Sequence, residues 1–282
     1  MRLATVIDGG RPRAAVVRDG GALLLALPDE RLNSVRGIAG GGDAALREVS
    51  QWAARHPSEA FVPLSELHLG PAVPDPGAIY TIGHNYRSPA EPDAAGPERP
   101  LVYGKAASSV SGDGWVVGWD RALTENVDAE IELGVVIGTA ATSGAPEKAI
   151  EHVFGYTCIN DMSSRDPWLD GDQWLVGKSM PGFCPVGPVV VTRDELSPAD
   201  LRLGCTVDGT AIQDGRTSSM RFAIAEIVAY LSRHLTLRPG DLIATGTPHR
   251  LDGPIGPHDH LRPGEVVTVW VEGIGELTTT IS

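Results

Sequence analysis

The sequence contains no long apolar run and only three cysteines. Its longest run of apolar residues, ALLLAL at 22–27, is too short to span a bilayer, and the opening MRLATVIDGG contains no apolar signal segment. Cys158, Cys184 and Cys205 lie far apart without CxxC spacing, which is typical of buried thiols in a reducing compartment. We therefore expect a cytoplasmic protein with no membrane partner.

Clusters of basic residues are absent as well. The chain has 23 Lys and Arg against 36 Asp and Glu, which gives a net charge of −13. With no basic patch or run, nucleic acid is not expected as a partner. A small anionic substrate would be repelled by the overall charge and would need a local cation to hold it.

The 34 glycines and 22 prolines are spread through the 282 residues, which predicts many turns and a β-rich α+β fold. Residues 1–70 are expected to form a small N-terminal α/β domain with strands near 3–7, 14–17 and 22–26. A helix is expected over 43–55, with Asp43 as its N-cap. The Pro-rich segment 71–77 is interpreted as a linker, and residues 78–282 as the main domain.

Three glycines, 40–42, precede the predicted helix. They would suit a phosphate-binding loop, but no strand leads into them and no Lys-Ser/Thr follows. We interpret them as a flexible connection. In the main domain the best predicted helix is 220–235, a shorter one is expected at 145–153, and the polar stretch 83–100 is expected to be a functional loop or lid.

The most informative stretch is VDAEIELGVVIG at 127–138. In an extended strand Asp128, Glu130 and Glu132 share one face, and the apolar residues between them form a core face. The Cβ atoms of Glu130 and Glu132 would lie roughly 6–7 Å apart, two strand rises, so both carboxylates could reach one cation. Taken alone, the same pattern also describes the solvated face of a half-buried strand.

Three further positions carry polar groups at strand ends or tight turns. Asp161 follows an apolar strand in NDMSSRD at 160–166, Lys178 lies in WLVGKS, and Thr245 and Thr247 frame the turn TGTP. Threonine hydroxyls and free backbone N–H groups in such a turn can hold a carboxylate. Each position alone is also compatible with an ordinary turn or a solvated lysine.

Taken together, these stretches resemble the fumarylacetoacetate hydrolase superfamily. Six motifs occur in order from about residue 79 to the end: GxNY, ExELxVVIG, GYTxxNDxSxRD, GKS, TSSMxF and PGDxIxTGTP. The resemblance implies a mixed β-sandwich roll preceded by a small N-terminal domain and assembled as a homodimer. It also implies a Mg²⁺- or Mn²⁺-dependent enzyme that acts on a small anionic 2-oxo or 1,3-dioxo acid.

The resemblance assigns roles to individual residues. Glu130, Glu132 and Asp161 match the three metal carboxylates. Hard oxygen donors without nearby Cys or His favour Mg²⁺, Mn²⁺ or Ca²⁺ over zinc and leave about three octahedral positions open. Lys178 matches a lysine that faces the substrate and can act in catalysis. The implied substrate-binding residues are Arg165, Tyr86, Thr247 and, less directly, Thr245.

The lid departs from the family pattern. Hydrolytic members often read NYxDHxxE, in which a His-Glu pair activates water, whereas this chain has Pro89 at the histidine position and Glu91 one residue early. Proline cannot accept a proton, so that dyad is not available here. His84 is a candidate replacement base. Pro167 and Trp168 stand where the family often has glutamine, and His249, His258 and His260 are expected on the surface.

Three functions are compatible with these residues. The default is hydrolytic cleavage of a C–C bond through a metal-stabilised enolate. An isomerase, tautomerase or decarboxylase needs the same enolate but less of a water-activating dyad. A non-catalytic family member is the third alternative, against which the intact carboxylate triad argues, because three close carboxylates repel one another without a cation.

Overall fold

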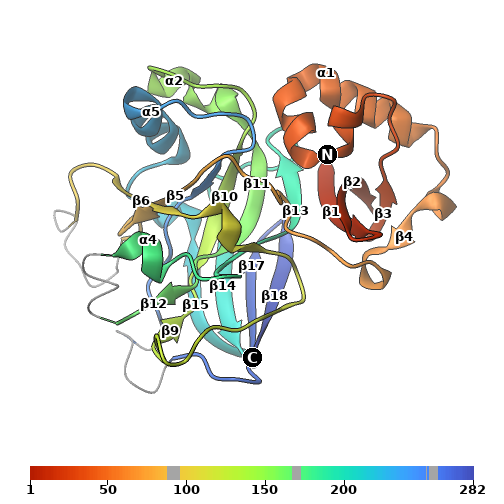
Figure 1. Cartoon of the computed structure of the whole chain (residues 1–282). Coiled ribbons are helices and arrows are strands. Elements are labelled where there is room, and N and C mark those ends of the chain that lie inside the picture. The colour runs from red at the N-terminus through yellow and green to blue at the C-terminus, as the bar shows by residue number, and fades with distance from the viewer. Residues whose placement is uncertain (88–95, 167–172, 252, 254–259) are drawn as a thin grey trace.

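The computed structural model describes the chain except for residues 88–95, 167–172, 252 and 254–259, and is dominated by two β-sheets (Figure 1). The larger sheet has the strand order β4-β3-β2-β1-β13-β11-β10-β16-β5-β6, with β7 attached to β13. The smaller sheet has the order β15-β14-β17-β18-β8, and β9 and β12 form a separate two-stranded ribbon. This β-rich α+β architecture confirms the predicted fold class.

The strands of the larger sheet are β1 (Arg2–Asp8), β2 (Arg11–Arg18), β3 (Gly21–Leu24), β4 (Val62–Pro63), β5 (Ile79–Gly83), β6 (Leu101–Lys105), β7 (Val110–Ser111), β10 (Ile131–Ile137), β11 (Val153–Asn160), β13 (Cys184–Thr192) and β16 (Leu242–Ala244). The other strands are β8 (Trp115–Val117), β9 (Val127–Asp128), β12 (Ser163–Ser164), β14 (Arg202–Val207), β15 (Thr210–Arg216), β17 (Val266–Val271) and β18 (Gly275–Ile281). The described α-helices are α1 (Val35–Ala54), α2 (Pro146–Ala149), α4 (Trp174–Gly177) and α5 (Ile224–His234).

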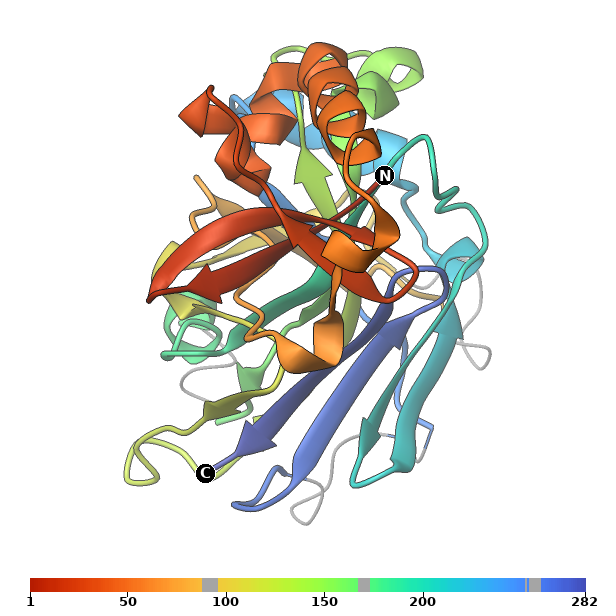
Figure 2. The same cartoon turned by 90° about the vertical axis from the view of Figure 1, so that its right-hand side faces the viewer.

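The N-terminal strands extend the larger sheet of the main domain. β1 pairs antiparallel with β13 at Arg2↔Val191 and Leu3↔Val190, and β2 and β3 follow on its other side. The segment 71–77 also packs closely, because Ala72 and Val73 are buried and Ala72 N donates to Val186 O at 2.8 Å. In Figure 2 the N-terminal strands cross in front of the main domain. The boundaries predicted at 70 and 78 remain a prediction.

Helix α1 begins earlier than predicted. Ser34, not Asp43, is its N-cap, and the Ser34 hydroxyl accepts a hydrogen bond from Gly37 N. The glycines interpreted as a flexible connection lie inside this helix, and Gly42 interrupts its geometry with φ 57° and ψ −147°. The reason for the error is packing, since Val35 and Ile38 are buried under the N-terminal strands and hold the first turns in place.

The two other predicted helices are present with shifted ends. α5 begins at Ile224, where Glu226 accepts a hydrogen bond from Ala223 N at 2.8 Å. The helix expected at 145–153 is the short α2 followed by a 3₁₀ turn, Ile150–His152. Among the described residues, no helix combines the length and the hydrophobicity that crossing a membrane requires.

Strand β10 has two faces with different surroundings. Ile131, Leu133 and Val135 point into the core between the two sheets, together with residues of β14, β17 and β18. The opposite face begins with Glu130 and Glu132 and ends at Val136, which belongs to the second core beside α1. The strand therefore runs from a polar site into packed protein, as its sequence predicts.

Candidate metal and substrate site

Three carboxylates meet at one end of β10 and β11. Glu130 precedes β10, Glu132 lies within it and Asp161 follows β11; antiparallel pairing places Ile131 opposite Asn160. Asp161 N donates to Glu130 O at 2.8 Å, which fixes the two backbones beside each other. One carboxylate oxygen from each residue lies within 4.8 Å of the others. This set of hard oxygen donors fits a divalent cation such as Mg²⁺ or Mn²⁺.

Two buried lysines each bind one carboxylate oxygen of Asp161. Lys178 Nζ lies 2.6 Å from Asp161 Oδ2 and also donates to Ser163 Oγ and Glu130 Oε2, while Lys105 Nζ lies 2.5 Å from Asp161 Oδ1. Burial alone would raise the pKa of Asp161, but the charges and hydrogen bonds of the two lysines outweigh it and lower that pKa to about 2. The Asp161 carboxylate is therefore ionised at any ordinary pH.

Two arginines, Arg165 and Arg250, lie beside Asp128. Arg165 Nη2 donates to Glu130 Oε1 at 2.5 Å and lies 3.4 Å from Asp128 Oδ2. Arg250 Nη1 lies 3.1 Å from Asp128 Oδ1. Burial would raise the pKa of Glu130, but the charges of Arg165 and Lys178 lower it. Asp128 thus holds two arginines at the rim of the triad rather than joining it.

Glu132 has a different environment from its two partners. Its side chain is buried (3% exposed), and its Oε2 accepts a hydrogen bond from Gly246 N at 2.6 Å. Within the described part of the chain no lysine or arginine forms an ion pair with it. Burial, followed by the charge of Asp161, raises the pKa of Glu132 well above its ordinary range. A divalent cation would supply the charge that this carboxylate lacks.

A cavity of about 800 Å³ opens onto the three carboxylates and gathers most of the predicted site residues. Its lining includes Glu130, Glu132, Asp161, Arg165, Lys178, His84, Tyr86 and Thr247. Thr245 is not part of this lining, because its buried hydroxyl donates to Leu133 O at 2.8 Å. The turn still contributes through its backbone, since Gly246 N binds Glu132.

His84 and Tyr86 occupy different depths of the cavity wall. His84 is exposed, directly follows β5 and has φ 53°, so it lies at the rim. Tyr86 is buried, and its hydroxyl has no hydrogen-bond partner among the described residues. Burial raises the pKa of Tyr86, which keeps the phenol protonated and able to donate a hydrogen bond.

The remaining positions named from the sequence have different outcomes. The structure does not describe five of them: Pro89, Glu91, Pro167, Trp168 and His258. His249 is exposed, as expected for a surface residue, but it also lines the cavity and lies with its Nε2 3.3 Å from Tyr86 O. His260 is half-buried.

Sequence reasoning missed Lys105 and Gln213. Lys105 ends the otherwise apolar strand LVYGK, and a lysine at the end of such a strand is a signal of a nearby polar site. Gln213 Oε1 accepts from Ile131 N at 2.9 Å, and its Nε2 donates to Thr247 Oγ1 at 2.8 Å. Because the Thr247 oxygen accepts this bond, its own proton can be donated to a ligand in the cavity.

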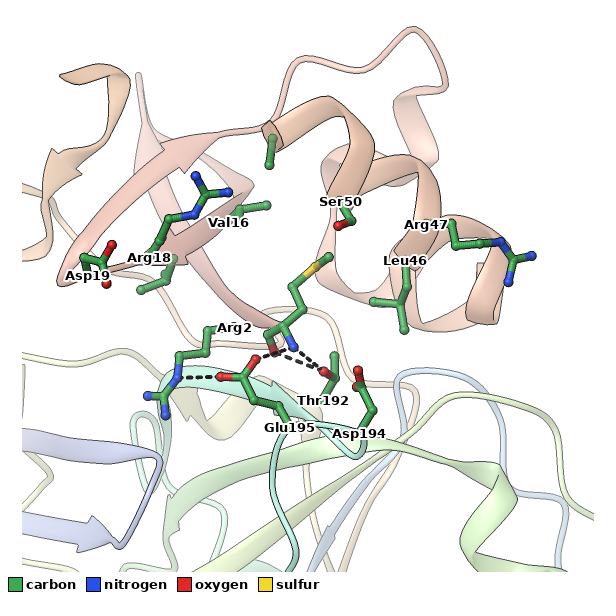
Figure 3. A pocket seen from close by; sticks show the side chains of 13 residues that line it. Arg2, Val16, Arg18, Asp19, Leu46, Arg47, Ser50, Thr192, Asp194 and Glu195 are labelled. Atoms are coloured by element: carbon green, nitrogen blue, oxygen red, sulfur yellow. Dashed lines mark hydrogen bonds and ion pairs between the residues drawn. The ribbon is translucent and has the colours of Figure 1, made fainter. Parts of the chain in front are cut away.

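A second cavity, of about 590 Å³, lies between the N-terminal strands, α1 and the end of β13 (Figure 3). Arg2 Nε lies 3.0 Å from Glu195 Oε1 at its edge, and the amino group of Met1 contacts Glu195 and Thr192. None of the predicted site residues lines it. The carboxylate triad therefore lines the first cavity and not this one.

The family described as "Fumarylacetoacetate (FAA) hydrolase C-terminal" matches residues 78–282. An uncharacterized protein of Staphylococcus aureus is 36% identical over 222 residues, covering 78% of this chain and 74% of that protein.

Solved structures agree with this match. A fumarylacetoacetate hydrolase from Exiguobacterium antarcticum superposes with a TM-score of 0.87 at 32% identity, covering 100% of this chain and 99% of that one. A 5-carboxymethyl-2-hydroxymuconate delta-isomerase from Mycobacterium smegmatis gives 0.78 at 28% identity, with coverage of 100% and 99%. A maleylpyruvate hydrolase from Sphingobium sp. SYK-6, in complex with manganese (II) ion and pyruvate, gives 0.79 at 26% identity, with coverage of 100% and 98%.

Proposed function

Because this chain belongs to the fumarylacetoacetate hydrolase family, we propose that it is a divalent-metal-dependent enzyme that cleaves a C–C bond of a 2-oxo or 1,3-dioxo acid by hydrolysis. The observation that carries the proposal is the meeting of Glu130, Glu132 and Asp161, with one oxygen of each within 4.8 Å of the others. Glu132 and Asp161 are buried. Burying a charged carboxylate is costly unless a positive charge compensates it.

The three carboxylates would hold Mg²⁺ or Mn²⁺, with Ca²⁺ as a weaker alternative. The donors are all oxygen, which these ions prefer, and one related hydrolase contains manganese and pyruvate. A cation bound there would polarise the ketone of a 2-oxo acid and stabilise the negative charge that develops on it.

The chain's own residues would bind and orient the rest of the substrate. Lys178 and Arg165 bring positive charge to a protein whose net charge is −13, so they counter the repulsion of an anionic substrate. Thr247 can donate its hydroxyl proton to a carboxylate, because Gln213 already occupies one of its lone pairs. The Tyr86 phenol offers a second neutral donor.

An isomerase or decarboxylase acting on a related keto acid is the second candidate. Two observations favour it: proline stands at the position of the family's lid histidine, and the structural relatives include an isomerase. Hydrolysis requires a base that activates the attacking water. The candidate for this base among the described residues is His84, at the cavity rim.

The first test is metal binding by calorimetry with Mg²⁺ and Mn²⁺. Glu130→Gln is expected to weaken binding at least tenfold, whereas Glu147→Gln, which changes an exposed glutamate of α2, should leave it unchanged. Unchanged metal binding in Glu130→Gln would contradict both enzymatic candidates.

The second test separates the two reactions. The protein is incubated with acylpyruvates and with oxaloacetate in the presence of Mg²⁺. Release of pyruvate and a carboxylic acid from an acylpyruvate identifies the hydrolase. Release of CO₂ from oxaloacetate, or keto–enol exchange without cleavage, identifies the alternative. If hydrolysis occurs, His84→Ala should lower kcat by about 10²–10⁴ should this residue be the base.

A further inference from the structure

Gln213 joins the two β-sheets at the wall of the carboxylate cavity. It lies on β15 in the smaller sheet, is 3% exposed and lines the cavity. Its Oε1 accepts from Ile131 N on β10, in the larger sheet, at 2.9 Å. Its Nε2 donates to Thr247 Oγ1 at 2.8 Å and to Pro248 O at 2.7 Å. One side-chain amide therefore connects the smaller sheet, the strand of the carboxylate triad and the TGTP turn.

The bond to Ile131 takes the place of a neighbouring strand. β16 pairs with β10 only from Gly134 to Val136, so it does not reach the backbone N–H of Ile131. A buried backbone N–H needs an acceptor, and the Gln213 carbonyl provides one. The peptide that joins Glu130 to Ile131 is thereby fixed, and with it the point from which the Glu130 side chain starts.

The two ends of the Gln213 amide can be told apart by their partners. Pro248 O can only accept, so the amide NH₂ group must face it, and the same group donates to Thr247 Oγ1. Ile131 N can only donate, so it must face the amide oxygen. The Thr247 oxygen is therefore an acceptor toward Gln213, and the hydroxyl proton remains for another partner.

Thr247 is the residue of this group that can meet a ligand. It is half-buried and lines the cavity, whereas Thr245 in the same turn is fully buried and donates to Leu133 O. Both N–H groups and the oxygen of the Gln213 amide are already bonded within the protein. Gln213 would therefore act on a ligand through Thr247 and not by direct contact.

We propose that Gln213 is a positioning residue that acts on the substrate through Thr247. Its Nε2 holds the Thr247 oxygen as an acceptor, so that the hydroxyl proton is donated to the substrate carboxylate. Its Oε1 holds the strand of Glu130 and Glu132, so one side chain sets the substrate donor and the metal ligands relative to each other. This proposal rests on the proposed function, because it needs a cation at the triad and an anionic ligand beside it.

The first test is a double-mutant cycle on pyruvate binding. Dissociation constants are measured by calorimetry at saturating Mg²⁺ for the wild type, Thr247→Val, Gln213→Glu and the double variant. Glutamate has the size of glutamine, but its carboxylate would accept the Thr247 proton, which is then not available to pyruvate. Thr247→Val is expected to weaken pyruvate binding about tenfold in the wild-type background and less than about twofold in the Gln213→Glu background. Thr247→Ser keeps the hydroxyl and should retain the wild-type affinity.

The second test measures the binding of Mg²⁺ alone. Gln213→Glu keeps an oxygen that can accept from Ile131 N, and its added negative charge favours a cation, so Mg²⁺ binding should not weaken. Gln213→Leu has no hydrogen-bonding atom in its side chain, so Ile131 N loses its acceptor. Mg²⁺ binding by this variant should weaken about two- to tenfold. The two substitutions therefore separate the two ends of the amide.

Asn33→Asp is the matched control. Asn33 bonds both N and O of Leu27 through its amide, so the substitution makes the same change from amide to carboxylate at a residue that does not line the cavity. It should leave both dissociation constants unchanged. Thermal melting with Mg²⁺ shows whether each variant is folded at the temperature of the titration. Should Gln213→Glu not fold, the cycle uses Gln213→Leu, in which the Thr247 hydroxyl is no longer held and Thr247→Val should weaken pyruvate only about two- to threefold.

Three results would overturn the proposal. An equal effect of Thr247→Val in both backgrounds would show that Gln213 does not direct the hydroxyl. Unchanged pyruvate binding in Thr247→Val alone would show that the hydroxyl does not meet the ligand. Unchanged Mg²⁺ binding in Gln213→Leu would show that the amide does not position the metal ligands. If the wild type with Mg²⁺ bound no pyruvate, the proposed function itself would fail, and that failure is recognisable because it involves no variant.

Discussion

Lys105 Nζ lies 2.5 Å from Asp161 Oδ1, and both side chains are almost completely shielded from solvent. Removing one member of a buried ion pair leaves the other charge uncompensated, which typically costs about 3–5 kcal/mol. Asp161 keeps Lys178 as a second partner, so Lys105→Met is expected to lower the free energy of unfolding by about 3 kcal/mol, at the low end of that range. Urea unfolding in the presence of EDTA measures this change in the free energy of unfolding.

The metal provides an internal check on this prediction. A divalent cation at the triad replaces the missing positive charge, so saturating Mg²⁺ should restore more stability to Lys105→Met than it adds to the wild type. Lys148→Met, which removes an exposed lysine of α2, should change unfolding by less than about 0.5 kcal/mol. Equal effects of the two substitutions would show that the buried pair contributes nothing specific.

Metal binding should release protons, and Glu132 is their expected source. Its pKa is raised by burial, so below that raised pKa the metal-free protein holds a proton on Glu132 that a bound cation must displace. Affinity for Mg²⁺ is therefore expected to rise with pH until the raised pKa of Glu132 is passed and to level off above it. Calorimetry in buffers of different ionisation enthalpy counts the protons, and the release should be absent in Glu132→Gln.

The same shift has a consequence for stability without metal. The folded state binds the Glu132 proton more tightly than the unfolded state, whose pKa is near 4.5. The contribution of Glu132 to the free energy of unfolding is thus fully present below pH 4.5, the unfolded-state pKa. It is lost as the pH rises through the raised pKa of the folded state. A metal-free protein that became steadily more stable over that interval, with no difference between the wild type and Glu132→Gln, would contradict this assignment.

The three candidate metal carboxylates could be predicted from the sequence, because local periodicity and family motifs locate them. Alternation along 127–138 places Glu130 and Glu132 on one face of a strand, and the family motifs point to Asp161. Lys105 and Gln213 could not be placed in this way. Their contacts join residues 56 and 82 positions apart, and only the pairing of distant strands brings them together.

The fold shows the same division between local and distant information. The β-rich class follows from the spread of glycine, proline and alternating segments, but the pairing of β1 with β13 has no local signal. The start of α1 was missed because the glycines at 40–42 have poor helix propensity. Packing of Val35 and Ile38 against the N-terminal strands outweighs that propensity, and a single sequence does not report it.

The three cysteines should be unreactive in the native protein. Burial raises the pKa of the Cys184 thiol to about 12 and raises those of Cys158 and Cys205 as well, so almost no thiolate is present at pH 8. All three side chains are fully buried. Reaction with a colorimetric disulfide reagent at pH 8 should be negligible over minutes in the native state and reach three thiols per chain in guanidinium chloride. Rapid labelling of one thiol in the native protein would contradict the burial of that residue.

Asn85 connects the segment after β5 to the TGTP turn and to Phe222. Its Nδ2 donates to Thr245 O at 2.7 Å and to Phe222 O at 3.2 Å, and its Oδ1 accepts from Phe222 N at 2.9 Å. It therefore holds the segment that carries His84 and Tyr86 against the TGTP turn. Asn85→Ala leaves buried backbone groups without partners and is expected to lower the free energy of unfolding by about 2–4 kcal/mol, from about 1–3 kcal/mol for each such group.

The comparison that isolates this role uses Asn33→Ala. Asn33 makes two similar hydrogen bonds to the backbone of Leu27, but it lies in the N-terminal part of the chain, far along the sequence from the cavity. Both substitutions should lower the melting temperature. At a temperature where each variant is fully folded, only Asn85→Ala should raise the dissociation constant of pyruvate in the presence of Mg²⁺, because only it loosens Tyr86 and Gly246 together. If the two variants bound pyruvate equally well, Asn85 would stabilise the fold without positioning the site.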